Sequence, residues 1–390
     1  MNTELNRIVR TVQEYYTDIK AFKINFIDRC RVDHKFEAYK IWSHWLLRNL
    51  CRKKQVYHLI PDPEHVRTDT YIIGHLLDKH FIGGKDNVKT FYDSITDSVQ
   101  VMYEKYNDLL IMIYHDEHRE ILKKLNNMTT QKIRNSTNEY IYKFFDHFTP
   151  YSEQIHNKLI QMYRQKDLHT FYFDMFALGF NYYIIDGNSL QWSIPRNVFR
   201  YMSSVFKCHM EFFASPMNAN LPLYCSLFRS ERVFGAINNF FNIDRKQIME
   251  GVYEINPPFI NEIFDNSCNI VFKLIQNSEN KGRELMFIYI MPDWVDCNTY
   301  NKLSTSLWCI KHIHLEKDKH TYYQISNCKY VMATFDAHIF IIGTSRAREK
   351  YSQSGEMKDD NAVAGEEFDM LKTEWYNTSS HLIDDDVITK

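Results

Sequence analysis

The sequence predicts an α/β fold with a mostly parallel sheet, preceded by an all-helical domain. Up to about residue 165, apolar residues recur at steps of three and four, the period of amphipathic helices. From about residue 190, short runs rich in β-branched and aromatic residues alternate with helical patterns. That alternation is typical of strands joined by crossover helices.

The first part of the chain carries the helical period in four segments, 8–29, 36–51, 88–115 and 137–163. Pro61 and Pro63 end one helix, and Asp62 is placed to cap the next. We therefore assign residues 1–170 to an all-helical domain.

The second part contains six predicted strands, and an amphipathic helix over 260–275 separates two of them. The last two strands read as a closing antiparallel hairpin. Ligands bind at the carboxyl ends of the strands in such sheets, so the turns there are expected to line one cleft. We assign residues 171–346 to this α/β domain, with strands over 209–216, 251–256, 284–292, 309–316, 329–335 and 337–343.

The charge is uneven along the chain. Residues 355–390 carry ten acidic residues and three lysines, whereas the rest has 44 basic and 39 acidic residues. We predict a flexible acidic tail over 347–390 and a mildly basic body that suits an anionic ligand.

Composition excludes several classes of protein. No apolar run approaches the length of a membrane span, and the eight cysteines show neither CxxC nor zinc-like spacing. The two histidines of "HDEH" (115–118) have no evident partner ligands, so we expect no metal site. We predict a soluble intracellular protein with reduced thiols and no membrane partner.

The stretch "GVYEINPPFINEIF" (251–264) holds the only Pro-Pro pair among nine prolines, at the end of a predicted strand. The Asn256 side chain and the Pro257 carbonyl can accept hydrogen bonds from the two hydrogens of a base amine, which makes its nitrogen more nucleophilic. Pro258 restricts Pro257 to an extended conformation, and Phe259 offers a face on which a base can stack. A rigid strand-ending turn is the simpler alternative, but the strand before and the helix after favour a catalytic corner.

The flanking segments carry a resemblance to a known family. "INPPFINEIF" together with "FFASPMNANLPLYCSLF" (212–228), "VFGAINNFF" (233–241), "FIYIMPDW" (287–294), "HTYYQI" and "YVMATFDAHIFIIG" resembles the cap-specific adenosine N6-methyltransferase family, also called phosphorylated-CTD-interacting factor. The likeness covers about residues 195–345. It implies a Rossmann-like domain that transfers a methyl group from S-adenosylmethionine to the cap-adjacent adenosine of capped mRNA.

The resemblance also implies roles for particular residues. Asn256, Pro257, Pro258 and Phe259 correspond to the family's catalytic tetrapeptide, and Ser215, Pro216 and Asn218 lie in the turn where we place the methyl donor. On the substrate side it implies Trp294, Val295, Asp296, Cys297, Asn298 and His320. Asn261 stands where the family has a substrate-contacting Glu, and only Trp294 of the 294–298 loop is shared, so contacts there can differ.

Three further expectations complete the sequence-based hypothesis. The helical start implies a member without the family's WW domain, and hence no WW-type docking to the RNA polymerase II tail. Arg29, Arg31, Arg48, Arg52 and Arg67 are phosphate-binding candidates. The open alternatives are methylation of adenines in internal RNA or DNA, and a non-catalytic RNA-binding member of the family.

Overall fold

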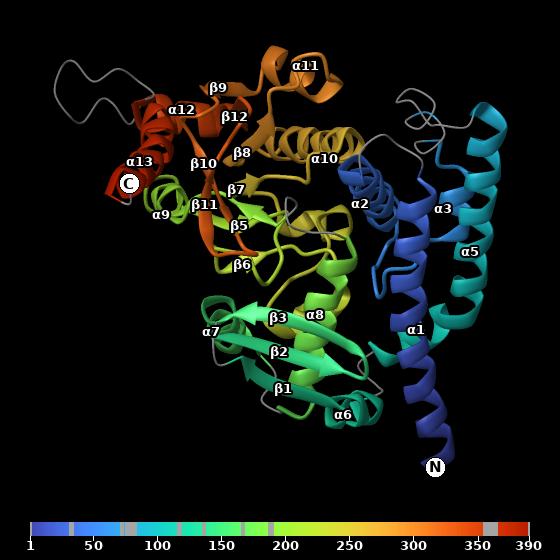
Figure 1. Ribbon diagram of the computed structural model, residues 1–390. Coiled ribbons are helices and arrows are strands. Elements are labelled where there is room, and N and C mark those ends of the chain that lie inside the picture. Colours follow the sequence, from blue (N-terminus) through green and yellow to red (C-terminus); the bar gives the residue numbers. More distant parts are fainter. Residues whose placement is uncertain are drawn as a thin grey trace. The chain divides into compact units, whose positions relative to one another are not determined.

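A computed structural model of the chain, shown in Figure 1, divides into two units. Unit 1 comprises residues 1–187 and 228–234, and unit 2 comprises 188–227 and 235–390. The first unit thus extends beyond the expected limit at residue 170. The structure describes residues 2–30, 35–70, 74, 84–114, 119–134, 138–164, 168–185, 191–353 and 366–388.

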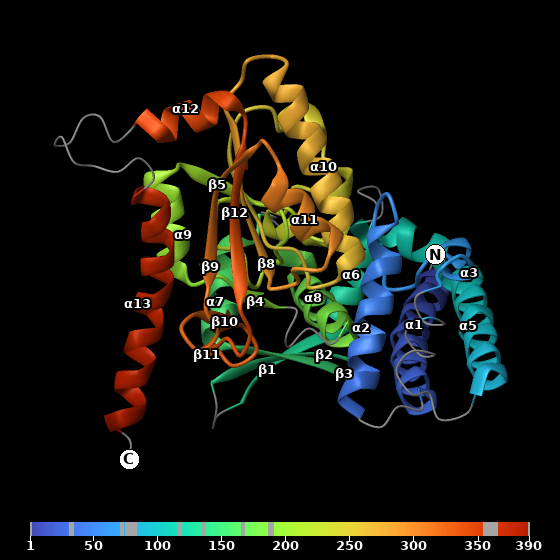
Figure 2. The same ribbon diagram turned by 90° about the horizontal axis from the view of Figure 1, so that it is seen from above.

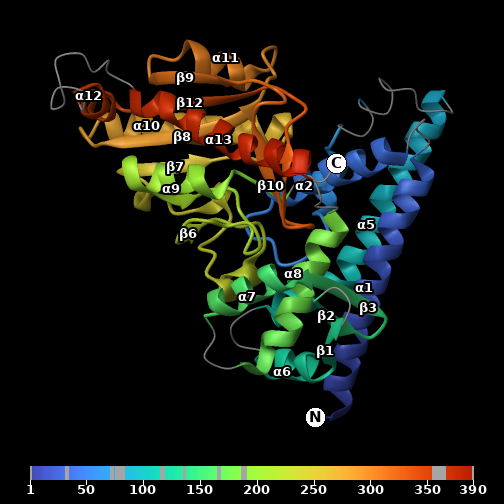
Figure 3. The ribbon, with the colours of Figure 1, turned by 60° about the vertical axis from the view of Figure 1, so that its left-hand side comes forward.

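Helices make up most of the described part of unit 1. The long helices α1 and α5 run side by side (Figure 3), and the Asp62 carboxylate caps α3 by accepting from the Glu64 N–H at 2.9 Å. The sequence predicted α1, α2 and α5 correctly. The helices are α1 (Asn2–Arg29), α2 (Lys35–Cys51), α3 (Pro63–Arg67), α5 (Gly84–Ile113), α6 (Arg119–Asn127), α7 (Glu153–Met162) and α8 (Phe171–Ile185).

Unit 1 is nevertheless not all-helical, which corrects the prediction. An antiparallel sheet of β1 (Thr129–Arg134), β2 (Glu139–Phe144) and β3 (His147–Ser152) occupies much of the predicted helix over 137–163. Its buried face packs on α8, where the Tyr151 hydroxyl donates to the Met175 carbonyl at 2.6 Å. A Cβ at Gly179 would lie 2.7 Å from that hydroxyl, so glycine permits the close approach.

The main sheet of unit 2 confirms the α/β class. Its strand order is β6-β5-β7-β8-β12-β9, in which β6, β5, β7 and β8 are parallel and β12 is antiparallel to both neighbours. The strands are β5 (Cys208–Glu211), β6 (Leu223–Tyr224), β7 (Gly251–Ile255), β8 (Leu285–Pro292), β9 (Cys309–Leu315) and β12 (Ala337–Gly343).

The predicted closing hairpin over 329–343 is wrong. β12 lies between β8 and β9, whereas β11 (Lys329–Met332) pairs with β10 (Thr321–Gln324) in a separate small sheet. β4 (Trp192–Ser193) completes that sheet in the order β11-β10-β4. A run of β-type residues predicts a strand, but it does not encode which partner the strand takes.

Helices cover both faces of the main sheet. Figure 2 shows α9 (Arg196–Val205) and α13 (Glu366–Ile388) on one side of the strands and α10 (Asn261–Glu279) and α11 (Asn298–Thr305) on the other. Each side has its own core of buried apolar residues. α12 (Ser345–Gln353) contributes to the core on the α9 side.

The predicted flexible tail over 347–390 is corrected by α12 and α13. Phe368, Leu371 and Trp375 lie on one face of α13 at helical spacing, and each is at most 2% exposed. The acidic residues Glu366, Glu367, Asp369 and Glu374 lie at other positions of this helix. All eight cysteines are free thiols. In the part of the chain that the structure describes, no helix is both long enough and apolar enough to span a bilayer.

Candidate active site

Three parallel strands of unit 2 end at the same edge of the sheet and bring the predicted segments together. β5 has β6 on one side and β7 on the other, so the chain changes direction across the sheet between β5 and β7. Ligands of open α/β sheets bind at such a switch point, outside the carboxyl ends of the strands. The Phe212 N–H donates to the Glu254 carbonyl at 3.1 Å, which places the start of the 212–218 segment beside the end of β7.

The Asn-Pro-Pro-Phe corner follows β7 directly. The strand begins at Gly251, whose φ of +111° is a left-handed conformation that suits glycine. After the strand, the Pro258 carbonyl accepts from the Ile260 N–H at 2.7 Å, and α10 begins at Asn261. The Asn256 Oδ1 atom is buried and has no hydrogen-bond partner within the structure. Such an atom is costly unless a ligand satisfies it, because burial removes its water.

The Phe259 ring is half-buried and in contact with other aromatic residues. Its centroid lies 5.7 Å from that of Phe335 and 6.1 Å from that of Trp294, both nearly edge-to-face. The structure thus brings together the corner after β7 and the Trp294 that follows β8. These rings form an apolar wall suited to a planar aromatic ligand.

The predicted cofactor turn is tightly bonded within itself. The Ser215 N–H donates to the Asn218 Oδ1 atom at 2.6 Å, and the Ser215 hydroxyl donates to Gln191 Oε1 at 2.6 Å. Ser215 and Asn218 are buried, as is Pro216. Their side chains therefore fix the shape of the turn.

Two buried carboxyl groups lie next to each other at this edge, Glu211 on β5 and Glu254 on β7, which are paired in register. The Glu211 Oε1 atom accepts from the N–H groups of Asn220 and Leu221, both at 2.5 Å. Burial raises the pKa of Glu254 well above its usual value, and the negative charge of Glu211 raises it further. Both effects favour the protonated form of Glu254, which lies two residues before Asn256.

The predicted substrate loop over 294–298 joins β8 to α11. Val295 and Asp296 are exposed, whereas the Cys297 Sγ atom caps α11 by accepting from the Tyr300 N–H at 3.3 Å. Asn298 is exposed and donates to the Asp265 carboxylate on α10 at 3.4 Å. Cys297 and Asn298 therefore anchor the loop, while Val295 and Asp296 are free to meet a ligand.

Asn261 and His320 lie in different surroundings. Asn261 is the exposed first residue of α10, two positions after Phe259. His320 is fully buried just before β10, and its ring centroid lies 6.1 Å from that of Phe335. Phe335 therefore contacts both Phe259 and His320.

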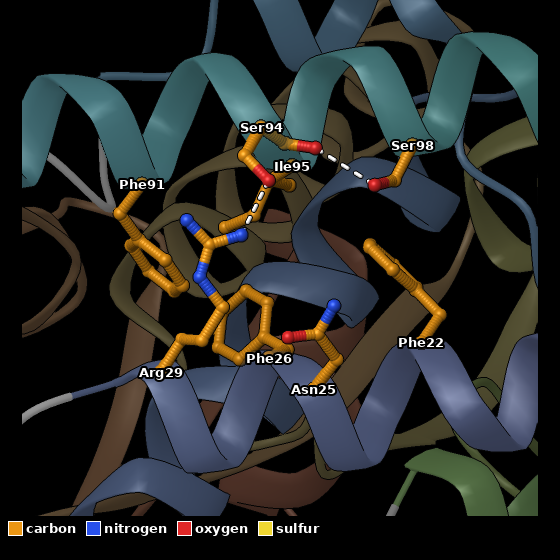
Figure 4. Close-up of a pocket in the computed structure, with 8 residues that line it drawn as sticks. All are labelled: Phe22, Asn25, Phe26, Arg29, Phe91, Ser94, Ile95 and Ser98. Atoms are coloured by element: carbon orange, nitrogen blue, oxygen red, sulfur yellow. Dashed lines mark hydrogen bonds between the residues drawn. The ribbon is translucent and has the colours of Figure 1, made fainter.

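The arginine candidates that the structure describes are engaged within unit 1. Figure 4 shows Arg29 donating to Ser94, at 2.5 Å, beside a cavity of about 10 Å³ that admits little more than one water molecule. Arg48 pairs with Asp69 at 3.0 Å, and Arg67 donates to Gln100 at 2.8 Å. Arg52 donates to the His65 carbonyl at 3.4 Å. Arg31 and "HDEH" lie outside the described residues.

Sequence reasoning missed four residues of this site, namely Glu211, Glu254, Gln191 and Phe335. A signal existed for the two glutamates, because each is the single charge in an apolar strand, in "HMEFF" and "GVYEIN". A lone carboxyl group on a buried strand is costly, so it marks a functional position. Gln191 and Phe335 carried no such signal.

Comparison with known proteins agrees with the resemblance found in the sequence. Residues 150–325 match a family model described as the phosphorylated CTD interacting factor 1 WW domain. The chain is also 32% identical over 121 residues to the mRNA (2'-O-methyladenosine-N(6)-)-methyltransferase of Mus musculus, and 31% identical over 121 residues to the protein of the same name from Homo sapiens. The matched stretch is 31% of this chain and covers only 16% of each relative.

The family match contradicts the expectation that the chain lacks the family's WW domain, because the matching model is described as that domain. The expectation was drawn from the helical start of the chain, but the match runs over residues 150–325. The expected absence of WW-type docking had the same basis and is withdrawn with it.

Proposed function

We propose that this chain, of which residues 150–325 match the phosphorylated CTD interacting factor 1 family model, is an S-adenosylmethionine-dependent methyltransferase acting on N6 of the cap-adjacent adenosine of capped mRNA. The names of the two mammalian relatives state this reaction for those proteins. The observation that carries the proposal is the buried, unpaired Asn256 Oδ1 atom in the corner after β7. A neutral acceptor at this place suits an amine as the reacting group.

The chemistry of an adenine amine explains why such a corner is needed. The nitrogen lone pair is delocalised into the ring, so the amine is a weak nucleophile. Acceptors at Asn256 Oδ1 and the Pro257 carbonyl favour a tetrahedral nitrogen, whose lone pair is localised, and so stabilise the transition state. The Phe259 ring orients the base by stacking, which contributes on the order of 1–3 kcal/mol.

The methyl donor fits the edge between β5 and β7. S-adenosylmethionine supplies an activated methyl group on a positively charged sulfur. The turn containing Ser215, Pro216 and Asn218 would hold it, as in a Rossmann-like fold. The switch point of the sheet supports this placement, and so does the buried Glu211 carboxylate, because negative charge favours a bound cation.

For the RNA, we propose contacts from Trp294, Val295, Asp296 and Asn261, with Cys297 and Asn298 holding the loop in shape. The exposure of Val295, Asp296 and Asn261 supports this division of roles. The resemblance implies that the family's helical domain helps to hold the cap, and we propose the same role for unit 1.

A direct test uses the full chain and two RNAs of one sequence, starting with 2′-O-methyladenosine, one capped and one ending in a 5′-triphosphate. With isotopically labelled S-adenosylmethionine, we expect label on the capped RNA, recovered after nuclease digestion as N6-methylated 2′-O-methyladenosine by mass spectrometry. Equal labelling of the uncapped RNA, or of internal adenosines, would contradict cap specificity. Labelling of neither RNA would contradict the proposed activity.

Asn256→Ala tests the mechanism. Loss of one acceptor that acts in the transition state is expected to lower kcat about 100- to 1,000-fold with RNA binding largely kept. Asn266→Ala is a matched control, because Asn266 is exposed on α10 close to the corner. Unchanged turnover in Asn256→Ala would refute the role of the corner.

A further inference from the structure

The C-terminal helix α13 contacts the segment that carries His320. Trp375 is 1% exposed, and its Nε1–H donates to the Thr321 carbonyl at 2.6 Å. Its ring lies edge-on to His320 and Tyr322, with centroids 6.0 Å and 5.7 Å away. Trp375, which is distant in the sequence, thus packs against one side of β10.

The same helix also contacts the residue that sets the His320 tautomer. The Tyr376 hydroxyl accepts from the Glu316 N–H at 2.9 Å. The Glu316 carbonyl lies 2.7 Å from His320 Nδ1, and because a carbonyl can only accept, Nδ1 carries the hydrogen. Burial lowers the pKa of His320 and so favours the neutral ring. The Nε2 atom is then a lone-pair acceptor.

This acceptor has no partner and lies close to the candidate site. His320 Nε2 is buried without a hydrogen bond in the structure. Its ring and that of Phe259 both contact Phe335 edge-on, at 6.1 Å and 5.7 Å. A buried acceptor without a donor is unfavourable, so its presence here points to a ligand that supplies an N–H group.

We propose that α13 belongs to the substrate site, with Trp375 as a positioning residue that sets His320 so that Nε2 accepts a hydrogen bond from an N–H of a nucleobase in the bound RNA. The inference rests on the proposed function. It assigns to the C-terminal helix a part in RNA recognition.

Contacts with α9 hold α13 in place, so that α13 can support β10 and His320. Phe368 stacks on Phe206 with centroids 5.1 Å apart, and the Tyr201 hydroxyl donates to the Glu367 carbonyl at 2.8 Å. The Asn197 side chain donates to the Glu374 carbonyl at 2.6 Å. A conservative change at Trp375 therefore alters the contact with β10 while the rest of the helix stays attached.

Three variants test the proposal by steady-state kinetics with capped RNA. Trp375→Phe keeps an aromatic ring but removes the donor to Thr321. His320→Asn can still donate from the place of Nδ1 but lacks an atom at Nε2. Both are expected to raise the KM for RNA about tenfold, the loss of roughly one hydrogen bond, with little change in the KM for S-adenosylmethionine. Met370→Ala, on the exposed side of α13, should behave as wild type.

A spectroscopic measurement separates this proposal from the proposed function. In histidine ¹⁵N-labelled protein, the His320 Nε2 resonance should show a lone-pair nitrogen that shifts when capped RNA is added, and Trp375→Phe should reduce that shift. A resonance that ignores RNA, or an RNA KM in Trp375→Phe equal to that of Met370→Ala, would overturn the inference. If wild type binds RNA without methylating it, the proposed function is wrong. The change of the His320 Nε2 resonance on RNA addition then tests this inference by itself.

Discussion

The ionisation of Glu254, a residue of the candidate site, makes the stability of the fold depend on pH. It lies on β7 two residues before Asn256, and burial together with Glu211 raises its pKa. The protonated form is thus the one that the fold favours. The pKa of Glu254 is higher in the folded state than in the unfolded state. The contribution of protonated Glu254 to the free energy of unfolding is therefore complete below the usual glutamate pKa range, and it is lost as pH rises toward the folded-state pKa.

We predict that Glu254→Gln removes the loss of stability that ionisation of Glu254 causes as pH rises. The difference in free energy of unfolding between variant and wild type should shift in favour of the variant as pH rises, by at most about 1.4 kcal/mol per pH unit. Urea unfolding at pH 5, 6, 7 and 8 measures it. Glu250→Gln is the control, since Glu250 is exposed just before β7. Parallel pH dependences for Glu254→Gln and wild type would contradict the assignment.

At the scale of elements, β12 determines the geometry of the loop after β8. His338 on β12 donates from Nε2 to the Asp293 carboxylate at 2.8 Å, and its Nδ1 accepts from His312 Nε2 at 2.9 Å. The Asp293 N–H donates to the Asp336 carbonyl at 2.9 Å. Asp293, the residue before Trp294, is therefore bonded to β12, the strand for which the sequence predicts a different partner.

A double-mutant cycle tests this connection. His338→Leu should lower the free energy of unfolding by about 0.5–1.5 kcal/mol, because it removes the hydrogen bond to the Asp293 carboxylate. Combined with Asp293→Asn, it should show a coupling energy of about 0.5–3 kcal/mol in urea unfolding. His314→Leu is a suitable comparison, since His314 pairs with Asp336 at 3.2 Å. Additive effects of the His338 and Asp293 changes would show that the bond does not hold the loop.

The elements that the sequence predicted well are those with strong local patterns. The strand before Asn256 and the helix after Phe259 were both found, because the apolar run, the two prolines and the helical period of 260–275 all act locally. The sequence predicts a helix over 137–163, where β2 and β3 form, since aromatic residues such as Tyr142, Phe144 and Tyr151 suit either structure. Only the packing of these residues on α8 decides between the two.

Other features depend on contacts that are distant in the sequence. The position of β12 between β8 and β9 is a property of the whole sheet. The composition predicts a tail in place of α13 because acidic residues dominate it, although Phe368, Leu371 and Trp375 have helical spacing. In the site, the tetrapeptide was visible from residue types alone. The contacts of Phe335 with Phe259 and His320 required the folded chain.

At the scale of the molecule, the chain alternates between its two units. Residues 228–234 fold with unit 1, although the residues on both sides of them belong to unit 2. The chain bears a net charge of −2, but ten of its acidic residues lie in 355–390. Part of that charge is held on α13, where Asp369 pairs with Lys311 at 2.9 Å. The remainder of the chain, with 44 basic and 39 acidic residues, has a positive balance of five.

This charge distribution predicts that RNA binding depends on salt. A positive body releases counterions from the RNA backbone, with a log–log slope of about −0.7 per phosphate neutralised in a single strand. With about three phosphates in contact, the affinity for capped RNA should fall roughly 10- to 20-fold between 50 and 200 mM salt. Fluorescence anisotropy with a labelled capped oligonucleotide measures it, and S-adenosylmethionine binding by calorimetry is the control, since its affinity should change far less. An RNA affinity that is constant across this range would mean that the bases, the cap and the aromatic contacts around Phe259 supply the binding without help from the basic body.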